Sequence, residues 1–466
     1  MKVKSLFLSA SALAGVFALS GCDQTEIPAS ETVNGNGTII TQEKYTVGMI
    51  YFNALDMNRS ETLSEQADAY RDVMLKVWYP AELTADSQPL RLGYHSKQYP
   101  YIEAITQTWL DDNYYSKAET LLSGAYSHAD ALDLNQPFPV LLYSPGFGST
   151  MEDNETLMVD LASQGYIVVS VGHAYEAEFM SLSGDGQYAT TNWGVWRKVY
   201  SYNDPSMNKP SWDLEMDNFD TKLSNNQLTE QDKERIYELY AMRTEASELL
   251  QSRSADLSFA LVQLEKLNGG QLTEMYNQQA ELTSLIGKLD FGNVGAVGWS
   301  FGGATVANFC TQEPLCKAAI NLDGQHIGLS EQSPAHKPYL MLHSTQKTVF
   351  DGDPKDEKYK LGEMLLRAEY QIAYEQQQQD TFLVQVENSV HNTFSDVTIT
   401  SPVFQPEWYT QYPHPEPSVF LSQNKLSKKV ISDFFATYIK NQGEYSTLVE
   451  SLNETSGLTV KGKIGN

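Results

Sequence analysis

Short apolar segments that alternate with helical segments constrain the fold of this chain more than any other feature. Each is a few residues long, rich in Val, Ile and Leu, and bounded by polar or glycine-containing stretches, as is typical of strands buried on both faces. These segments span residues 139–143, 165–171, 294–299, 317–322, 338–343 and 381–386. Helical patterns over residues 154–163 and 303–309 separate some of them. The alternation predicts a mostly parallel, doubly wound α/β sheet with right-handed crossovers.

Two further segments, residues 45–52 and 74–78, are expected to add strands at the edge of this sheet. The connection after the second inner strand is far longer than an ordinary crossover, which predicts an insert or cap at about residues 176–288. Much of it has a helical pattern, above all residues 228–264. The sequence leaves open whether this insert is a lid over a site or a packed cap without contact to the chemistry.

The N-terminal residues 1–21 have the build of a secretory signal peptide. Two lysines precede an apolar run over residues 6–19, which is too short for a membrane span and is closed by small residues. The sequence Leu-Ser-Gly-Cys at its end resembles a bacterial lipobox and predicts acylation of Cys22. We therefore expect a protein anchored by lipid to the bacterial cell envelope, on the periplasmic side. Asp23 resembles an inner-membrane retention signal, yet inner and outer membrane both stay open, as does an ordinary secretory signal with a chance cysteine.

The rest of the chain divides into a polar segment, one large domain and a short end. Residues 22–43 are polar and lack a hydrophobic period, which predicts a flexible tether. Residues 44–442 are expected to form a single α/β domain, and residues 443–466 a C-terminal tail.

Acidic residues outnumber basic ones, with 59 Asp and Glu against 32 Lys and Arg among 466 residues, a formal net charge of −27. This charge argues against nucleic acid and anionic membrane surfaces as electrostatic partners, so attachment to a membrane is expected to be covalent. It also favours neutral or zwitterionic substrates. Hydrophobic residues make up 41% of the chain, enough for a sizeable core.

Two cysteines besides Cys22 lie close together, at Cys310 and Cys316. In an exported, oxidising compartment such a pair predicts a disulfide, with two free thiols as the alternative. A metal site is not expected, because no His stands at ligand spacing beside them.

One Gly-x-Ser-x-Gly motif, at residues 298–302, directly follows an apolar strand segment and precedes a helical one. A nucleophile elbow needs this context, because the glycines let strand and helix approach closely while the turn exposes the serine hydroxyl. The motif predicts Ser300 as a nucleophile; the alternative is a glycine-rich turn with a structural serine.

A serine hydroxyl needs a general base, and among the eight histidines His391 lies on the loop after the last predicted strand, where this fold places the base. The acid is ambiguous. Asp323, which follows the strand segment at residues 317–322, is favoured over Asp351 and Asp353. A buried Asp would fix the tautomer of the imidazole and stabilise its charged form.

Two backbone N–H groups must face the negative charge that develops in acyl transfer. Phe301, directly after the serine, is expected to provide one. Phe147, between Gly146 and Gly148 at the end of the first inner strand, is expected to provide the other. The alternative for Phe147 is a simple strand-end turn.

Several blocks of sequence carry a family resemblance. They are residues 77–80 (Val-Trp-Tyr-Pro), 144–148 (Ser-Pro-Gly-Phe-Gly), 298–306, 321–324 (Asn-Leu-Asp-Gly) and 389–396. Together they resemble the platelet-activating factor acetylhydrolase family, in its plasma and type II form. The resemblance implies an α/β-hydrolase fold, a calcium-independent serine esterase that removes short or oxidised acyl chains from phospholipids, and Asp323 as the acid. The chain departs from the family at Trp299 and at Ser144, where His is common, and in its insert.

The resulting hypothesis is hydrolysis of short-acyl esters through an acyl-serine intermediate, without cofactor or metal, on a small-molecule or phospholipid ester. One alternative is a general carboxylesterase, lipase or polyester hydrolase that uses the same residues. Another is a non-catalytic binding lipoprotein built on a hydrolase fold.

Overall fold

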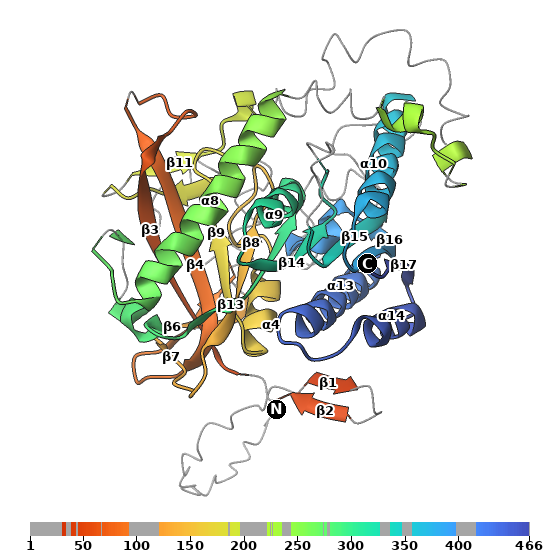
Figure 1. Cartoon of the computed structure of the whole chain (residues 1–466). Coiled ribbons are helices and arrows are strands. Elements are labelled where there is room, and N and C mark those ends of the chain that lie inside the picture. Colours follow the sequence, from red (N-terminus) through yellow and green to blue (C-terminus); the bar gives the residue numbers. More distant parts are fainter. Residues whose placement is uncertain are drawn as a thin grey trace, which may run out of the picture.

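One mixed β-sheet with helices on both faces organises the computed structural model of this chain (Figure 1). The structure describes residues 30–33, 39–42, 45–66, 68–92, 121–184, 187–195, 221–223, 225, 227–234, 244–273, 275–276, 280–326, 336–346, 357–397 and 416–465. The strands of the sheet lie in the order β17-β16-β15-β14-β13-β8-β9-β4-β3-β6-β5.

The central strands are those that the apolar segments predict. They are β8 (Phe138–Ser144), β9 (Ile167–Val171), β13 (Leu289–Trp299), β14 (Cys316–Leu322), β15 (Tyr339–Gln346) and β16 (Thr381–Val390). Neighbours within this set pair in parallel. Their sequences are continuously apolar because helices cover both faces of a parallel sheet. The predicted doubly wound α/β sheet is confirmed.

The two segments expected at the sheet edge form a long antiparallel hairpin inside it. β3 (Val47–Ser60) pairs with β4 (Tyr70–Glu82), and β4 pairs antiparallel with β9 on its other side. Beyond β3 the sheet continues with β6 (Leu122–Ser127) and β5 (Gln88–Arg91). The sequence analysis does not predict these two short strands, because several residues in each are exposed and no apolar run marks them.

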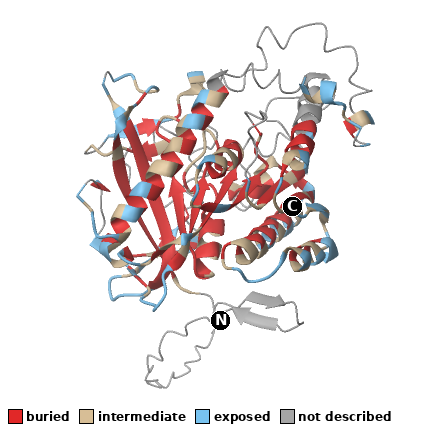
Figure 2. Cartoon of the chain, in the orientation of Figure 1, coloured by how far each residue is buried: buried red, intermediate tan, exposed pale blue. Residues whose placement is uncertain are grey.

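Helices cover the sheet on both faces, and Figure 2 shows the buried residues gathered in the sheet and on the helix sides that face it. The helices of one face are α8 (Thr244–Asn268), α9 (Phe301–Gln312) and α10 (Glu357–Gln376). Those of the other face are α4 (Glu155–Ser163), α13 (Pro417–Tyr438) and α14 (Tyr445–Glu454). Alternate residues of one strand serve opposite faces: Leu142 packs in the first layer and Leu141 in the second.

The insert expected at about residues 176–288 needs a correction at its C-terminal part. Helix α8 buries Leu257, Leu261 and Leu264 in the apolar cluster on the sheet, and η2 (Ala280–Leu285) follows it into β13. Leucines three and four residues apart make one side of α8 apolar, and that side covers the sheet. The described residues between 244 and 288 therefore belong to the body of the domain. Before them, the structure describes a small hairpin of β10 (Phe179–Ser181) and β11 (Tyr188–Thr190).

The expected C-terminal tail, residues 443–466, is also corrected. It contains α14 and β17 (Leu458–Lys463), and β17 pairs antiparallel with β16 at the end of the sheet. Leu448 and Leu452 of α14 are buried against the sheet, so this segment is held by apolar packing as well as by strand pairing. The expected flexible tether likewise contains an antiparallel pair, β1 (Ser30–Val33) with β2 (Ile39–Gln42).

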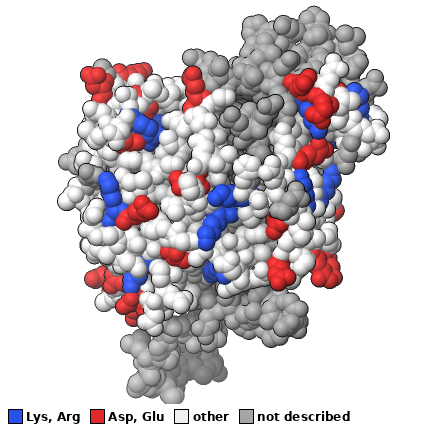
Figure 3. All heavy atoms as spheres, viewed as in Figure 1, with Lys and Arg blue, Asp and Glu red and all other residues white. Residues whose placement is uncertain are grey.

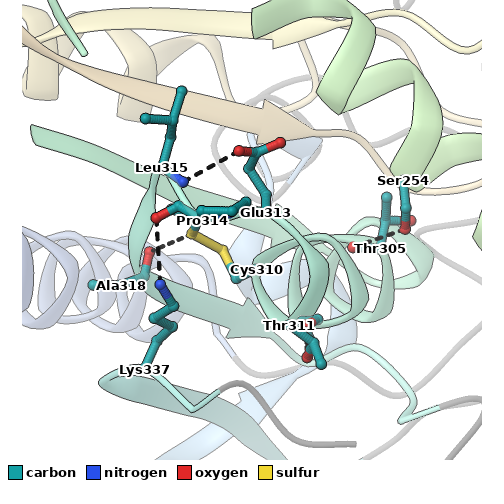
Figure 4. Close-up of a disulfide and its surroundings, with 11 residues drawn as sticks. Ser254, Thr305, Cys310, Thr311, Glu313, Pro314, Leu315, Ala318 and Lys337 are labelled. Carbon is teal, nitrogen blue, oxygen red and sulfur yellow. Dashed lines mark hydrogen bonds between the residues drawn. A yellow bond between two sulfur atoms is a disulfide. The ribbon is translucent and has the colours of Figure 1, made fainter. Parts of the chain in front are cut away.

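The predicted disulfide is confirmed: Cys310 at the end of α9 is bonded to Cys316 at the start of β14 (Figure 4). Both cysteines are buried, and their Cα atoms lie 5.2 Å apart. The bond closes the short turn between helix and strand.

Residues 1–21 and Cys22 lie outside the described residues, so the signal peptide and acylation remain predictions. Within the described ranges, no helix is both long and apolar enough to cross a membrane. On the face drawn in Figure 3, acidic and basic side chains are interspersed among uncharged residues.

Candidate active site

Ser300 stands at a sharp turn between β13 and α9. Its backbone has φ 57° and ψ −124°, a conformation that few residues other than glycine adopt. The turn is so tight that a Cβ atom on Gly298 would lie 2.2 Å from the carbonyl oxygen of Gly302. Only glycine fits there, which explains the glycines of the motif. Ser300 is partly exposed at the carboxyl edge of the sheet, in the geometry of a nucleophile elbow.

Asp323 and His391 meet at the same edge of the sheet. Nδ1 of His391 lies 2.7 Å from Oδ2 of Asp323. The side chain of Asp323 is fully buried, whereas that of His391 is 20% exposed. A buried carboxylate that accepts a hydrogen bond from Nδ1 leaves Nε2 as the atom that can exchange a proton with a neighbour.

Ser344, at the carboxyl end of β15, is a site residue that the sequence analysis missed. Its backbone N–H donates to Oδ1 of Asp323 at 2.9 Å, and its hydroxyl donates to Oδ2 at 3.0 Å. These bonds fix the carboxylate in the orientation that meets His391. The only sign of Ser344 in the sequence is that a hydroxyl residue stands near the end of β15, the strand that pairs with β14.

Trp299 connects the serine turn to the histidine loop. Its indole stacks on the imidazole of His391, with ring centroids 5.0 Å apart and planes inclined by 28°. Its Nε1 donates to the backbone carbonyl of His391 at 3.2 Å. Because Trp299 directly precedes Ser300, this contact places the imidazole beside the elbow.

The loop after β8 lies against the serine. A Cβ atom on Gly146 would lie 3.5 Å from Cβ of Ser300. The rings of Phe147 and Phe301 meet edge to face, with centroids 6.0 Å apart. The two residues expected to provide the oxyanion N–H groups therefore lie side by side next to the nucleophile.

A buried carboxyl group anchors this loop from within. Asp153 accepts hydrogen bonds from the N–H of Gly146, at 3.1 Å, and from the hydroxyl of Tyr143. Burial raises the pKa of Asp153 to about 7, against the opposing effect of these bonds. The backbone carbonyl of Asp153 accepts the N–H of Asp396 at 2.7 Å. Asp153 therefore also connects the loop that carries His391 to the loop after β8, residues 145–149, which we call the oxyanion loop.

Apolar side chains from separate parts of the chain pack around Phe147 and Phe301. They are Leu63, Val195, Ala246, Leu249, Leu250 and Ala304. Helix α8 therefore contributes its first turns to the surroundings of the oxyanion loop. An apolar wall beside polar reacting groups is typical of ester-binding sites.

The structure thus brings Ser300, Asp323 and His391 to one edge of the sheet, with Phe147 and Phe301 beside them. The alternative acids, Asp351 and Asp353, lie outside the described residues. In the part of the chain that is described, no group of three or more His, Cys, Asp or Glu residues has a metal-binding arrangement. The arrangement is equipped for acyl transfer to a serine.

Comparison with known proteins finds relatives that share part of this sequence. The platelet-activating factor acetylhydrolase of Cavia porcellus is 22% identical over 335 residues, which cover 70% of this chain and 64% of that protein. The corresponding protein of Gallus gallus is 22% identical over 275 residues, 57% of this chain and 54% of its own length. The chain thus spans less than two thirds of either relative.

A solved structure shares the fold. The ferulic acid esterase from Streptomyces cinnamoneus has a TM-score of 0.57 and 19% identity, with 89% of this chain and 96% of that chain covered. The family model of platelet-activating factor acetylhydrolase, isoform II, matches residues 40–425. Since that range holds most of the sequence and all of the candidate site, the chain belongs to the platelet-activating factor acetylhydrolase isoform II family.

Proposed function

We propose that the chain is a serine esterase that hydrolyses short-acyl carboxylic esters through an acyl-serine intermediate. The observation that carries the proposal is the buried Asp323, 2.7 Å from His391, at the edge where Ser300 occupies a nucleophile elbow. Membership of an acetylhydrolase family supports the same class of reaction.

In acylation, Nε2 of His391 takes the proton of Ser300 as Oγ bonds to the ester carbonyl carbon. The carbonyl oxygen becomes an oxyanion, stabilised by the N–H groups of Phe147 and Phe301. The bond from carbon to the alcohol oxygen then breaks, and His391 returns the proton to the leaving alcohol. Water repeats these steps on the acyl-serine, which releases the carboxylic acid and restores the serine.

For the substrate, we propose phospholipids with a short acyl chain at the second glycerol position. The names of the relatives support this class, and the acidic composition favours a zwitterionic head group over an anionic one. The apolar wall around Phe147 and Phe301 suits an acyl chain beside the oxyanion.

The test compares p-nitrophenyl acetate, butyrate and octanoate with phosphatidylcholines that carry acetyl, butyryl or long chains at the second position. Ser300→Ala should lower turnover at least ~10⁴-fold. Ser432→Ala, on helix α13 where its hydroxyl accepts from Gln164, is the matched control and should keep full activity. Retained activity in Ser300→Ala would overturn the assignment of the nucleophile.

The same panel separates the alternatives. Hydrolysis of simple esters together with refusal of every phospholipid would favour a general carboxylesterase. If no ester reacts and Ser300 resists a fluorophosphonate probe, the chain is a binding protein on a hydrolase fold.

We also propose that Cys22 is acylated and anchors the protein in the bacterial cell envelope. The order Leu-Ser-Gly-Cys after a short apolar run supports this. Labelled palmitate should enter the wild-type chain and Cys310→Ser, but not Cys22→Ser. Density-gradient separation of the membranes would then distinguish inner from outer location; label in Cys22→Ser would contradict the anchor.

A further inference from the structure

A second Ser–His–Asp set lies buried behind the oxyanion loop. The hydroxyl of Ser144 is 3.0 Å from Nε2 of His173, and Nδ1 of His173 is 2.8 Å from Oδ2 of Asp256. All three residues are at most 1% exposed. No substrate can reach Ser144 in this position. The set is therefore expected to have a structural role in its surroundings.

Ser144 directly precedes the oxyanion loop. It is the last residue of β8 and stands in register with Gly298 of β13, two residues before the nucleophile. A Cβ atom on Gly302 would lie 1.9 Å from the carbonyl oxygen of Ser144, so loop and elbow are in direct contact. A small shift of Ser144 therefore moves one side of the oxyanion hole against the other.

Arg253 of helix α8 joins the set to both sides of the oxyanion hole. Its Nη2 donates to the carbonyl of Pro145 at 2.5 Å and lies 3.3 Å from the hydroxyl of Ser144. Its guanidinium carbon lies 5.2 Å from the ring centroid of Phe301. One buried side chain thus contacts Ser144 and Pro145, which precede Phe147 in the chain, and the side chain of Phe301 itself.

Glu176 ties the other end of the loop to the same network. Its carboxylate lies 3.8 Å from Nε of Arg253 and accepts from Arg71 at 3.0 Å. Its backbone carbonyl accepts the N–H of Gly148 at 2.8 Å. The loop that carries Phe147 is therefore bound on either side, through Pro145 and through Gly148.

His173 is neutral, and the charged groups around it pair with one another: Arg71 with Asp256 and Glu176, and Arg253 with Glu176. Burial, followed by the nearby Arg253, lowers the pKa of His173 to about 3. Burial opposes ionisation of Asp256, but the charge of Arg71 and the hydrogen bonds from His173 and Arg71 together outweigh it, so the pKa of Asp256 is below its ordinary value. Neutral His173 donates through Nδ1 to Asp256 and accepts the Ser144 hydroxyl, whose oxygen then accepts from Arg253.

We propose that Arg253 is a positioning residue of the oxyanion hole, which it holds by bridging the Pro145 carbonyl and the Phe301 ring. The inference rests on the proposed esterase function. The planar guanidinium can contact both partners at once, whereas a lysine ammonium is a single point of charge. Positioning of the donors affects the transition state more than the bound ester.

The test uses Arg253→Lys, which keeps the charge, and Arg253→Met, which removes it. Arg253→Lys should lower kcat about 10- to 100-fold with KM within about threefold, and Arg253→Met should lower kcat further. The affinity for an alkylboronic acid, which forms a tetrahedral adduct on Ser300, should fall by the same factor as kcat. Assays are run well below the melting temperature of each variant, and Arg253→Lys stays informative if Arg253→Met does not fold.

Ser254→Ala is the matched control, because Ser254 is the next residue on α8 and is also buried, but its partners lie on α9. Its hydroxyl donates to the carbonyl of Thr305 (Figure 4) and accepts from the side-chain amide of Asn308. It should leave kcat and boronate affinity within about twofold. Equal kcat in Arg253→Lys and wild type would overturn the proposal, as would equal losses in Arg253→Lys and Ser254→Ala.

The proposed function and this inference can fail separately. If wild type hydrolyses none of the esters but Ser300 reacts with a fluorophosphonate, the labelling rate replaces kcat: a slower rate in Arg253→Lys supports positioning, and an unchanged rate overturns it. If wild-type Ser300 does not react at all, both are wrong.

Discussion

Ser300 directly follows β13 and Ser144 ends the neighbouring strand β8, and each belongs to a Ser–His–Asp set of its own. His391 and Asp323 are 2.7 Å apart, and His173 and Asp256 are 2.8 Å apart. The residue types are the same, and the two His–Asp distances are nearly equal. The surroundings differ: the side chain of His391 is 20% exposed, and that of His173 is 1% exposed.

The two aspartates also have different partners. The carboxylate of Asp323 accepts hydrogen bonds from the N–H and the hydroxyl of Ser344. Its other partner is the partly exposed His391. Asp256 is bound by the guanidinium groups of Arg71 and Arg59. Burial and the nearby Arg253 hold the pKa of His173 far below its ordinary value, so His173 is poorly suited to take up a proton as a base must. The two sets thus have the same residue types and differ in their exposure to solvent and in the charged groups beside them. These surroundings distinguish the reacting set of Ser300 from the supporting set of Ser144.

The largest expected difference is in turnover of the two Asp→Asn variants. Asp323→Asn should lower kcat about 10⁴-fold, because the amide favours the wrong tautomer of His391. Asp256→Asn should lower kcat of the folded protein no more than about tenfold, since it acts only through the oxyanion loop. Steady-state kinetics on a short ester measures both. Similar losses in the two variants would remove the functional distinction between the sets.

The free energy of unfolding should fall more in Asp256→Asn than in Asp323→Asn, which is the opposite of the order expected for kcat. Asp256→Asn leaves Arg71 buried with one acidic partner fewer and should lower the free energy of unfolding by about 3–5 kcal/mol. Asp323→Asn loses hydrogen bonds to Ser344 and His391 and should cost about 1–3 kcal/mol. Urea unfolding followed by fluorescence gives both values. A larger loss in Asp323→Asn would contradict the supporting role of the buried set.

The disulfide provides a perturbation that touches neither set. It joins Cys310 and Cys316 at the far end of the helix that begins after Ser300. Replacing both cysteines by serine should lower the free energy of unfolding by about 2 kcal/mol, from loop entropy alone. At a temperature where the variant is folded, kcat should be unchanged. A tenfold fall in kcat would mean that the elbow depends on the whole of α9.

The smallest effect is the pH dependence that comes from His173. The unfolded chain binds a proton at this residue below pH 6.5, whereas the folded chain does not until about pH 3. His173 therefore stabilises the fold fully above pH 6.5, and this contribution declines as the pH falls. Relative to His173→Asn, wild type should lose about 1.5 kcal/mol between pH 6.5 and pH 5. A constant difference over this range would show that His173 titrates in the folded protein as it does in the unfolded chain.

Much of the fold could be predicted from the sequence because strands buried on both faces are continuous apolar runs. β9 and β14 are of this kind. Edge strands leave no such signal: β17 runs Leu-Thr-Val-Lys-Gly-Lys with none of its residues buried, and pairing to β16 alone defines it as a strand. The helical pattern of α8 is visible in the sequence, but no local signal shows that this helix packs on the sheet, so the sequence predicts an insert there.

The reacting residues could be predicted for a similar reason. Ser300, Asp323 and His391 each follow a strand directly, and the carboxyl ends of parallel strands meet at one edge. Arg253, His173 and Asp256 carry no local motif. His173 follows β9, Arg253 and Asp256 lie on α8, and all three gain their roles only through burial. A charged residue in a helix is usually solvated, and only tertiary structure shows that Arg253 is not.

Two reacting residues share an unusual backbone: Ser300 has φ 57° and Asp323 has φ 53°. Left-handed conformations cost ordinary side chains roughly 1–2 kcal/mol, and glycine escapes this cost. A gene copy released from selection for activity can therefore gain stability by a change to glycine at Ser300, which should raise its melting temperature. At Asp323 the same change also loses the hydrogen bonds to Ser344 and His391, which offsets the gain. Among related sequences, the most heat-resistant would then include some that have lost the reaction, and heat resistance would be a poor guide to which copies still work.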